Sequence, residues 1–254
     1  MTDTAGAVTH DAFLGGRLTL QQPVRGYRAG VDPVLLAATV PATPGQTVLD
    51  LGCGVGTAML CLHARVPGLT LTGVEVLRDY ADLAASNAAN AGAQAKIHCA
   101  DLMLLPDAVR QQTFDHVITN PPYFDRRAGA PADDDARDLG RGGPVGLRDW
   151  LDVAIKRIKP KGWMSLIAPT AQLDTVLATI HGRLGTIRVL PLAARAGRAP
   201  GLVIVQAQHG GRTPLFLAPT LPMHADPVHM SDAPDYTPLI QSILRDGRQL
   251  PICG

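Results

Sequence analysis

A short apolar run that ends in three alternating glycines constrains the fold of this chain more than any other feature. The run is Thr47–Leu51, and Gly52, Gly54 and Gly56 follow it. An apolar run of this length is typical of a parallel strand that is buried on both faces. Glycine permits positive φ and lets the backbone lie directly against a ligand. We therefore predict a strand, then a tight ligand-binding turn, then a helix.

Strand-like and helix-like segments alternate after this turn. Further strands are predicted at residues 69–74, 96–99, 114–119, 162–167, 186–190 and 202–208, and helices at 58–64, 78–91, 148–158 and 171–183. This alternation favours an α/β fold, a doubly wound and mostly parallel Rossmann-like sheet with helices on both faces. In such sheets ligands bind beyond the carboxyl ends of the strands, and the motifs of this chain fall at those ends.

Length and composition narrow the class of protein. The 254 residues suit one sizeable α/β domain, with a lead-in over 1–46 that packs on it, a core over 47–208, and a C-terminal extension with a short helix over 209–254. The net charge of +1 does not mark a nucleic-acid binder, and the four cysteines lack zinc-site spacing, so no metal is expected. The chain shows neither a signal peptide nor an apolar stretch that could span a membrane. A cytoplasmic protein is expected.

Acidic residues stand at the ends of the two predicted strands that follow the glycine turn. Glu75 ends the first of them, where a carboxylate can accept hydrogen bonds from ribose hydroxyls. Asp101 and Leu102 follow the next, and could contact an adenine ring with a carboxylate and an apolar side chain. The G-x-G-x-G spacing lacks the G-x-G-x-x-G of dinucleotide sites and suits a ligand without phosphates. The alternative is a plain glycine turn with two capping or solvent-facing acids.

Asn120, Pro121, Pro122 and Tyr123 form a second motif, directly after the predicted strand at 114–119. The two prolines stiffen the backbone as it leaves the strand. The Asn120 amide oxygen and the Pro121 carbonyl could accept the two N–H groups of an exocyclic amine and favour a pyramidal nitrogen without a strong base. Tyr123 offers a face on which a planar group could stack. The alternative is that the prolines only end a strand and that Tyr123 belongs to the core.

Together these motifs resemble the class I methyltransferases with an Asn-Pro-Pro-Tyr motif, and in particular the bacterial tRNA1(Val) (adenine(37)-N6)-methyltransferase family. The likeness runs from about Asp11 to Arg245 and includes residues 25–38, 202–207 and 236–238. It implies a seven-stranded sheet, S-adenosylmethionine as the cofactor, and N6-methylation of an adenine beside the anticodon of a tRNA.

The resemblance also assigns roles to residues of this sequence. The catalytic motif would be Asn120-Pro121-Pro122-Tyr123, in which Asn120, Pro121 and Tyr123 hold the target base. The cofactor site would draw on the strand ends and on the lead-in: Gly30, Asp32, Asp50, Gly52, Gly54, Gly56, Glu75, Asp101, Leu102 and Asn120. Gly30 and Asp32 would lie near the methionine end of the cofactor.

Several substrates remain open at this point. For tRNA, the candidate phosphate contacts are Arg25, Arg28 and Arg126, although any single arginine can be an ordinary solvated side chain. A protein-glutamine N5-methyltransferase would present the same N–H pair, but the lead-in is short for the helical substrate domain such enzymes usually carry. Another RNA or DNA amino-methyltransferase is possible, although a large DNA-recognition domain finds no room here. An inactive cofactor-binding scaffold and a Rossmann dehydrogenase are more distant alternatives.

Overall fold

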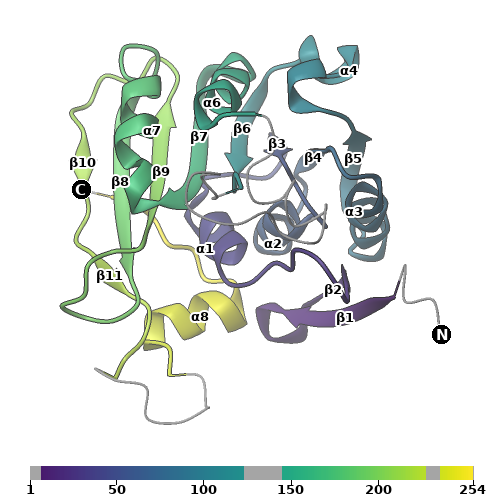
Figure 1. The fold of residues 1–254 in the computed structure, drawn as a ribbon, viewed down its shortest axis with the longest axis horizontal. Coiled ribbons are helices and arrows are strands. Elements are labelled where there is room, and N and C mark those ends of the chain that lie inside the picture. The colour runs from purple at the N-terminus through teal and green to yellow at the C-terminus, as the bar shows by residue number, and fades with distance from the viewer. Residues whose placement is uncertain (1–6, 123–144, 227–234, 254) are drawn as a thin grey trace, which may run out of the picture.

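The computed structural model describes residues 7–122, 145–226 and 235–253, and it contains one large twisted sheet (Figure 1). Seven strands lie in the order β5-β4-β3-β6-β7-β9-β8. They are β3 (Thr47–Leu51), β4 (Thr70–Glu75), β5 (Gln94–Cys99), β6 (Phe114–Thr119), β7 (Ile158–Pro169), β8 (Gly185–Ala193) and β9 (Leu202–Gln208). Only β9 is antiparallel to its neighbours in this series. All seven predicted strands are present, which confirms the doubly wound, mostly parallel sheet.

Two further strands extend this sheet beyond the seven expected. They are β10 (Phe216–Leu217) and β11 (Leu221–Pro222), and both pair with β8 in parallel. A two-residue strand is too short to show an alternating pattern in the sequence, so neither could be predicted from periodicity.

Helices cover both faces of the sheet, as predicted. One face packs on α1 (Asp32–Thr39), α2 (Thr57–Arg65), α3 (Arg78–Asn90) and α8 (Pro238–Asp246), and the other on α6 (Leu147–Lys156), α7 (Leu173–Ile180) and the short α4 (Asp107–Arg110). Alternate residues of β3 divide between the two cores, with Val48 in the first and Leu49 and Leu51 in the second. None of the helices in the described ranges has the length and apolar character needed to cross a bilayer.

Short 3-10 turns account for the small differences in the predicted helices. The helix predicted at 171–183 is divided into η3 (Thr170–Gln172) and α7, which ends at Ile180, shortly before Gly182 at a φ of +74°. A similar turn, η2 (Leu102–Leu104), follows β5 and joins the sheet to α4.

The lead-in forms a hairpin that is not among the predicted elements. β1 (Val8–Phe13) and β2 (Leu18–Pro23) pair antiparallel across η1 (Leu14–Gly16), and β2 contacts α2 and α3. The buried Asn87 of α3 fastens it, because its Oδ1 accepts from the Gln21 amide at 2.7 Å and its Nδ2 donates to the Gln21 carbonyl at 3.0 Å. Figure 1 shows the hairpin next to α8 along one edge of the molecule. The chain then leads through residues 24–31 into α1 at the strand ends.

Candidate active site

The three glycines of the turn after β3 differ in what surrounds them. All have positive φ, +69° at Gly52, +55° at Gly54 and +87° at Gly56. A Cβ on Gly52 would lie 2.7 Å from the Trp150 ring, and one on Gly56 would lie 2.9 Å from the Met59 methyl carbon. A Cβ on Gly54 would meet no described atom within 4 Å. Gly54 therefore leaves its backbone open to a ligand, while the other two glycines make room for packing.

The end of β4 holds this turn in place. The backbone amides of Gly52 and Cys53 both donate to the Val74 carbonyl, at 2.8 and 3.0 Å. The Glu75 carboxylate accepts from the Gly54 amide at 2.9 Å with one oxygen and from the Leu77 amide at 3.0 Å with the other. Burial raises the pKa of Glu75. Each of its oxygens has a second lone pair with which a carboxylate can accept a ligand hydroxyl.

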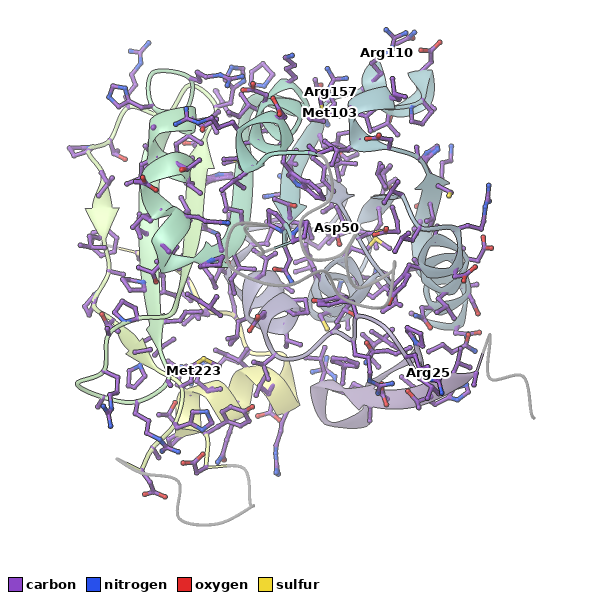
Figure 2. All side chains as sticks on the ribbon, viewed as in Figure 1. Arg25, Asp50, Met103, Arg110, Arg157 and Met223 are labelled. Carbon is purple, nitrogen blue, oxygen red and sulfur yellow. The ribbon has the colours of Figure 1, made fainter. Side chains whose placement is uncertain are left out.

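Asp50 lies beneath the turn at the centre of the molecule (Figure 2). It is only 2% exposed, and among the described residues its Oδ2 has no hydrogen-bond partner. Burial, reinforced by the charge of Glu75 and opposed by a hydrogen bond from the Met59 amide, raises the pKa of Asp50 to about 7. A buried acceptor without a donor is costly, so this oxygen is the atom of the site that most needs a donor from a ligand.

The end of β5 supplies a third acid and an apolar rim. Asp101 accepts a hydrogen bond from the Met103 amide at 2.8 Å and so caps η2. One of its oxygens therefore has the capping role that the alternative interpretation of these acids expected. Leu102 is buried, whereas Val76, which directly follows Glu75, is 51% exposed. Val76 is not among the predicted site residues, although the sequence does show an apolar residue directly after the acid that ends β4. In the described residues no group of three or more His, Cys, Asp or Glu could hold a metal ion.

The end of β6 is joined to the end of β3 by side-chain hydrogen bonds. The Thr119 hydroxyl donates to the Leu51 carbonyl at 2.8 Å and accepts from the Trp150 indole N–H, also at 2.8 Å. The same indole ring lies against Gly52, so one side chain of α6 braces both motifs. Asn120 and Pro121 follow at this edge, with Pro121 buried. Tyr123 and Arg126 lie outside the described residues.

Comparison with known proteins identifies the family. The model of the methyltransferase small domain matches residues 29–133. The tRNA1(Val) (adenine(37)-N6)-methyltransferases of Aeromonas hydrophila and Shewanella halifaxensis are 30% and 32% identical to this chain. Each match covers 72% of the chain, and 77% and 75% of the two relatives. The chain belongs to this family of methyltransferases.

Solved structures agree with the fold of this methyltransferase. A predicted O-methyltransferase from Agrobacterium tumefaciens superposes with a TM-score of 0.68 at 24% identity, over 87% of this chain and 98% of that one. The 16S rRNA N2 G1207 methyltransferase of Thermus thermophilus, in complex with AdoMet and guanosine, gives a TM-score of 0.55 at 17% identity, over 80% and 50%. At these identities the likeness concerns the fold alone.

S-adenosylmethionine is the cofactor of this methyltransferase, and the described residues fit it. The cofactor has a ribose, an adenine and a positively charged methionine end. The Oδ2 atom of Asp50, which has no partner among the described residues, can accept a hydrogen bond from a cationic donor. The open space at Gly54 allows a ligand to lie directly against the backbone. The acids at the ends of β4 and β5 provide acceptors for hydroxyl and amino groups.

The lead-in of the methyltransferase brings its own residues to the same strand ends. α1 begins at Asp32, whose pKa is raised by burial, and a Cβ on Gly30 would meet no described atom within 4 Å. Burial raises the pKa of the Tyr27 hydroxyl, and the charges of Asp32 and Asp50 raise it further. The Tyr27 hydroxyl in turn accepts a hydrogen bond from the Asn120 Nδ2 at 3.4 Å. The structure therefore gathers the lead-in, the glycine turn and the second motif around one region.

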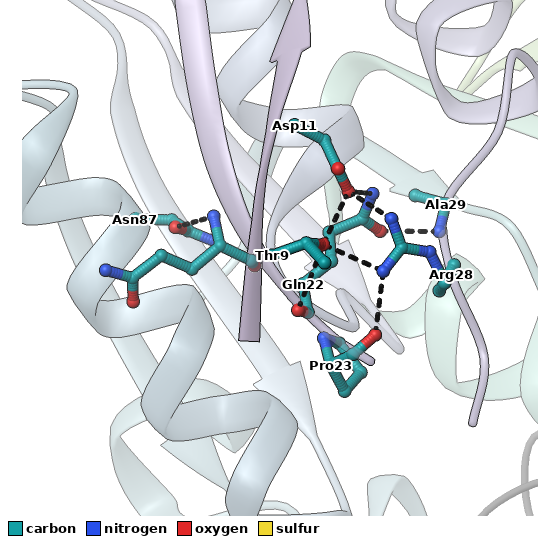
Figure 3. Close-up of polar contacts among 8 residues, drawn as sticks. Thr9, Asp11, Gln22, Pro23, Arg28, Ala29 and Asn87 are labelled. Carbon is teal, nitrogen blue, oxygen red and sulfur yellow. Dashed lines mark hydrogen bonds and ion pairs between the residues drawn. The ribbon is translucent and has the colours of Figure 1, made fainter. Parts of the chain in front are cut away.

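The two described arginines that were proposed to bind RNA differ in their surroundings. The Arg28 guanidinium forms an ion pair with Asp11 at 2.6 Å and donates to the Thr9 hydroxyl and the Pro23 carbonyl (Figure 3). It thus ties residues 24–31 to the hairpin. Arg25 is exposed, and Figure 2 shows it at the edge of the molecule beside the hairpin.

Proposed function

We propose that this methyltransferase transfers a methyl group from S-adenosylmethionine to N6 of an adenine in tRNA, at position 37 beside the anticodon. The observation that carries the proposal is the placement of Asn120-Pro121-Pro122 at the end of β6, directly next to β3 and its glycine turn in the sheet. The names of its relatives supply the substrate class. We further propose that the protein acts in the cytoplasm, where it would meet this substrate.

Asn120 and Pro121 would prepare the amine for attack. The lone pair of an adenine amine is delocalised into the ring, which makes the nitrogen a weak nucleophile. Two acceptors at fixed positions, the Asn120 amide oxygen and the Pro121 carbonyl, would bind its two N–H groups and favour a pyramidal nitrogen. When bound, the cofactor supplies an electrophilic methyl group. The surplus proton of the methylated amine can leave to water, so these residues need not include a strong base.

The cofactor would lie along the carboxyl ends of β3, β4 and β5. Glu75 would accept from the ribose hydroxyls while it keeps its bonds to the turn, and the Gly54 backbone would lie against the ligand. Asp101 and Leu102 would contact the adenine, with the exposed Val76 as an additional apolar face. Gly30, Asp32 and Asp50 would surround the methionine end, where the positive charge offsets the buried carboxylates.

The RNA would approach over the lead-in. Arg25 is free to contact a backbone phosphate because no side-chain partner holds it among the described residues. Arg126, which follows the second motif in the sequence, would be a further phosphate contact. Arg28 would mainly stabilise the conformation of the lead-in, because its guanidinium forms an ion pair with Asp11. An unpaired anticodon-loop base can leave its stack at low cost, which suits a recessed pocket.

Methyl transfer to defined substrates tests this proposal. Labelled S-adenosylmethionine is incubated with an unmodified tRNA1(Val) transcript, the same transcript with guanine at position 37, and a glutamine-containing peptide. We expect label only in the first, and its loss in Asn120→Ala but not in Asn90→Ala, an exposed asparagine at the end of α3. Equal label in both transcripts would refute the position, label in the peptide alone would refute the RNA substrate, and full activity of Asn120→Ala would refute the catalytic assignment.

A further inference from the structure

The Tyr27 side chain, which comes from the lead-in, contacts Asn120 of the second motif. Its hydroxyl accepts from the Asn120 Nδ2 at 3.4 Å, across 93 positions of sequence. The residue as a whole is 44% exposed, yet its hydroxyl lies toward the strand ends, where burial and the nearby Asp32 raise its pKa to about 12. The hydroxyl therefore stays protonated and neutral at physiological pH.

The backbone on both sides of Tyr27 is fastened to the rest of the protein. The Tyr80 hydroxyl of α3 donates to the Tyr27 carbonyl at 3.1 Å. The Ala29 amide donates to the buried Gln22 side chain at 2.7 Å, and Arg28 is held by Asp11 and by the Pro23 carbonyl (Figure 3). Gln22 also donates to Asp11 at 2.7 Å. The hairpin and α3 thus fix where the phenol ring of Tyr27 points.

The contact bears on the orientation of a carboxamide. An asparagine side chain presents an acceptor and a donor group that exchange places when the amide turns over. In the proposed reaction, the acceptor atom of Asn120, Oδ1, must face the target amine. In this structure Nδ2 faces the Tyr27 hydroxyl. Because a hydroxyl can also donate, the contact holds the carboxamide in place beside Tyr27, and the amine of the substrate, which offers two N–H donors, selects Oδ1.

We propose that Tyr27 is a positioning residue that holds the Asn120 carboxamide in place for the amine of the substrate. This inference rests on the proposed function, since it assumes that Asn120 binds the reacting amine. Tyr27 acts through Asn120 and needs no contact with the cofactor or the base.

Removal of the hydroxyl alone tests the inference. We expect Tyr27→Phe to lower the single-turnover rate at saturating tRNA and S-adenosylmethionine about fivefold, the size of one neutral hydrogen bond. The dissociation constant for S-adenosylmethionine should stay within about twofold of the wild-type value, because the ring of residue 27 and all the proposed cofactor residues are retained. Tyr236→Phe, a matched change next to His224, should leave the rate unchanged.

A double-mutant cycle separates positioning from any independent effect. In an Asn120→Ala background, Tyr27→Phe should cause no further loss, because the group that it holds in place is gone. A wild-type rate for Tyr27→Phe, or the same fivefold loss in the Asn120→Ala background, would overturn the inference. If Asn120→Ala itself kept the wild-type rate, the proposed function would fail; if Asn120→Ala were slow and Tyr27→Phe were not, only the inference about Tyr27 would fail. Cofactor binding by each variant confirms that it is folded.

Discussion

The cofactor half of the site, which comprises Asp50, the glycine turn and Glu75, is held by backbone hydrogen bonds and by burial. The amine half, which comprises Tyr27, Asn120 and Pro121, is held by side chains that meet from distant parts of the chain. In the first half the Gly54 amide bonds to Glu75 at 2.9 Å, and Asp50 is 2% exposed. In the second half the bond between Asn120 and Tyr27 is 3.4 Å long, and Tyr27 is 44% exposed.

This difference indicates which property each half controls. Groups buried under a turn stabilise the fold and also bind the ligand. Substitutions there should therefore alter both the unfolding free energy and the affinity for the ligand. Pro121 is buried, but the side chains of Asn120 and Tyr27 are not, so changes to those two should alter the reaction rate and leave the fold intact.

Asn120→Ala should separate the reaction rate from cofactor binding. We expect the rate of methyl transfer to fall by about 10³-fold, equivalent to about 4 kcal/mol, as for the loss of a preorganised polar group in an active site. Isothermal titration should give a dissociation constant for S-adenosylmethionine within about threefold of wild type, and the melting temperature should not change. A large loss of cofactor affinity would mean that Asn120 belongs to the cofactor half instead.

Asp50→Asn should change how the stability of the cofactor-free protein depends on pH. The pKa of Asp50 is about 7 in the folded protein and 3.8 as its ordinary value, so the folded state holds the proton more tightly than the unfolded state does. Its contribution to stability therefore falls by about 4 kcal/mol as pH rises from about 4 to about 7, and it stays low above that pH.

Urea unfolding from pH 4 to pH 8 checks this prediction. Asp50→Asn should remove the decline and be the more stable protein near pH 8, while it binds S-adenosylmethionine more weakly. Asp82→Asn, at an exposed acid of α3, serves as the control and should retain the wild-type profile. Parallel profiles for wild type and Asp50→Asn would contradict the account of Asp50.

Gly52→Ala and Gly54→Ala should differ although they lie two residues apart. The new methyl group at position 52 would meet Trp150, so overpacking and the left-handed backbone together should cost about 2–4 kcal/mol of unfolding free energy. At position 54 only the backbone strain of about 1–2 kcal/mol should appear, accompanied by weaker cofactor binding. Thermal unfolding with and without S-adenosylmethionine distinguishes them, and equal destabilisation would contradict the distinct roles of the two glycines.

Arg25→Ala and Arg28→Ala should act on different properties. Loss of one phosphate contact at Arg25 should weaken tRNA binding by about 1 kcal/mol and reduce the slope of log affinity against log salt by about 1. Arg28→Ala should leave that slope unchanged and instead speed hydrogen exchange in the hairpin, because the bond to Asp11 is lost. The assignment would be reversed if Arg28→Ala alone lowered the slope.

Much of the fold follows from local sequence pattern. Most of the seven principal strands are apolar runs between turn signals, while β5 instead alternates polar and apolar residues, and these patterns allowed all seven to be placed. In β2 the buried Leu18, Leu20 and Gln22 alternate with residues that are less buried. The hairpin was nevertheless missed, because one of the three buried residues is polar. α1 was missed because seven of its eight residues are buried, which leaves little helical period to detect.

The parts of the candidate site that could be predicted are those that directly follow a single recognisable strand. The glycine turn, Glu75 and Asp101 could be placed because each follows a recognisable strand. The separate roles of Gly52 and Gly54 depend on Trp150, which arrives from α6 about a hundred residues later. The contact between Tyr27 and Asn120 depends on how the hairpin packs against α3, and no local pattern in the sequence reports that packing.

The identity of the methylated nucleoside tests the central claim most directly. An unmodified tRNA1(Val) transcript is incubated with the protein and S-adenosylmethionine, digested to nucleosides and to fragments, and analysed by mass spectrometry against authentic standards. We predict N6-methyladenosine as the product, confined to the fragment that contains position 37, and its absence with Asn120→Ala. Methylation of a ring nitrogen or carbon instead of an exocyclic amine would contradict the role assigned to Asn120 and Pro121.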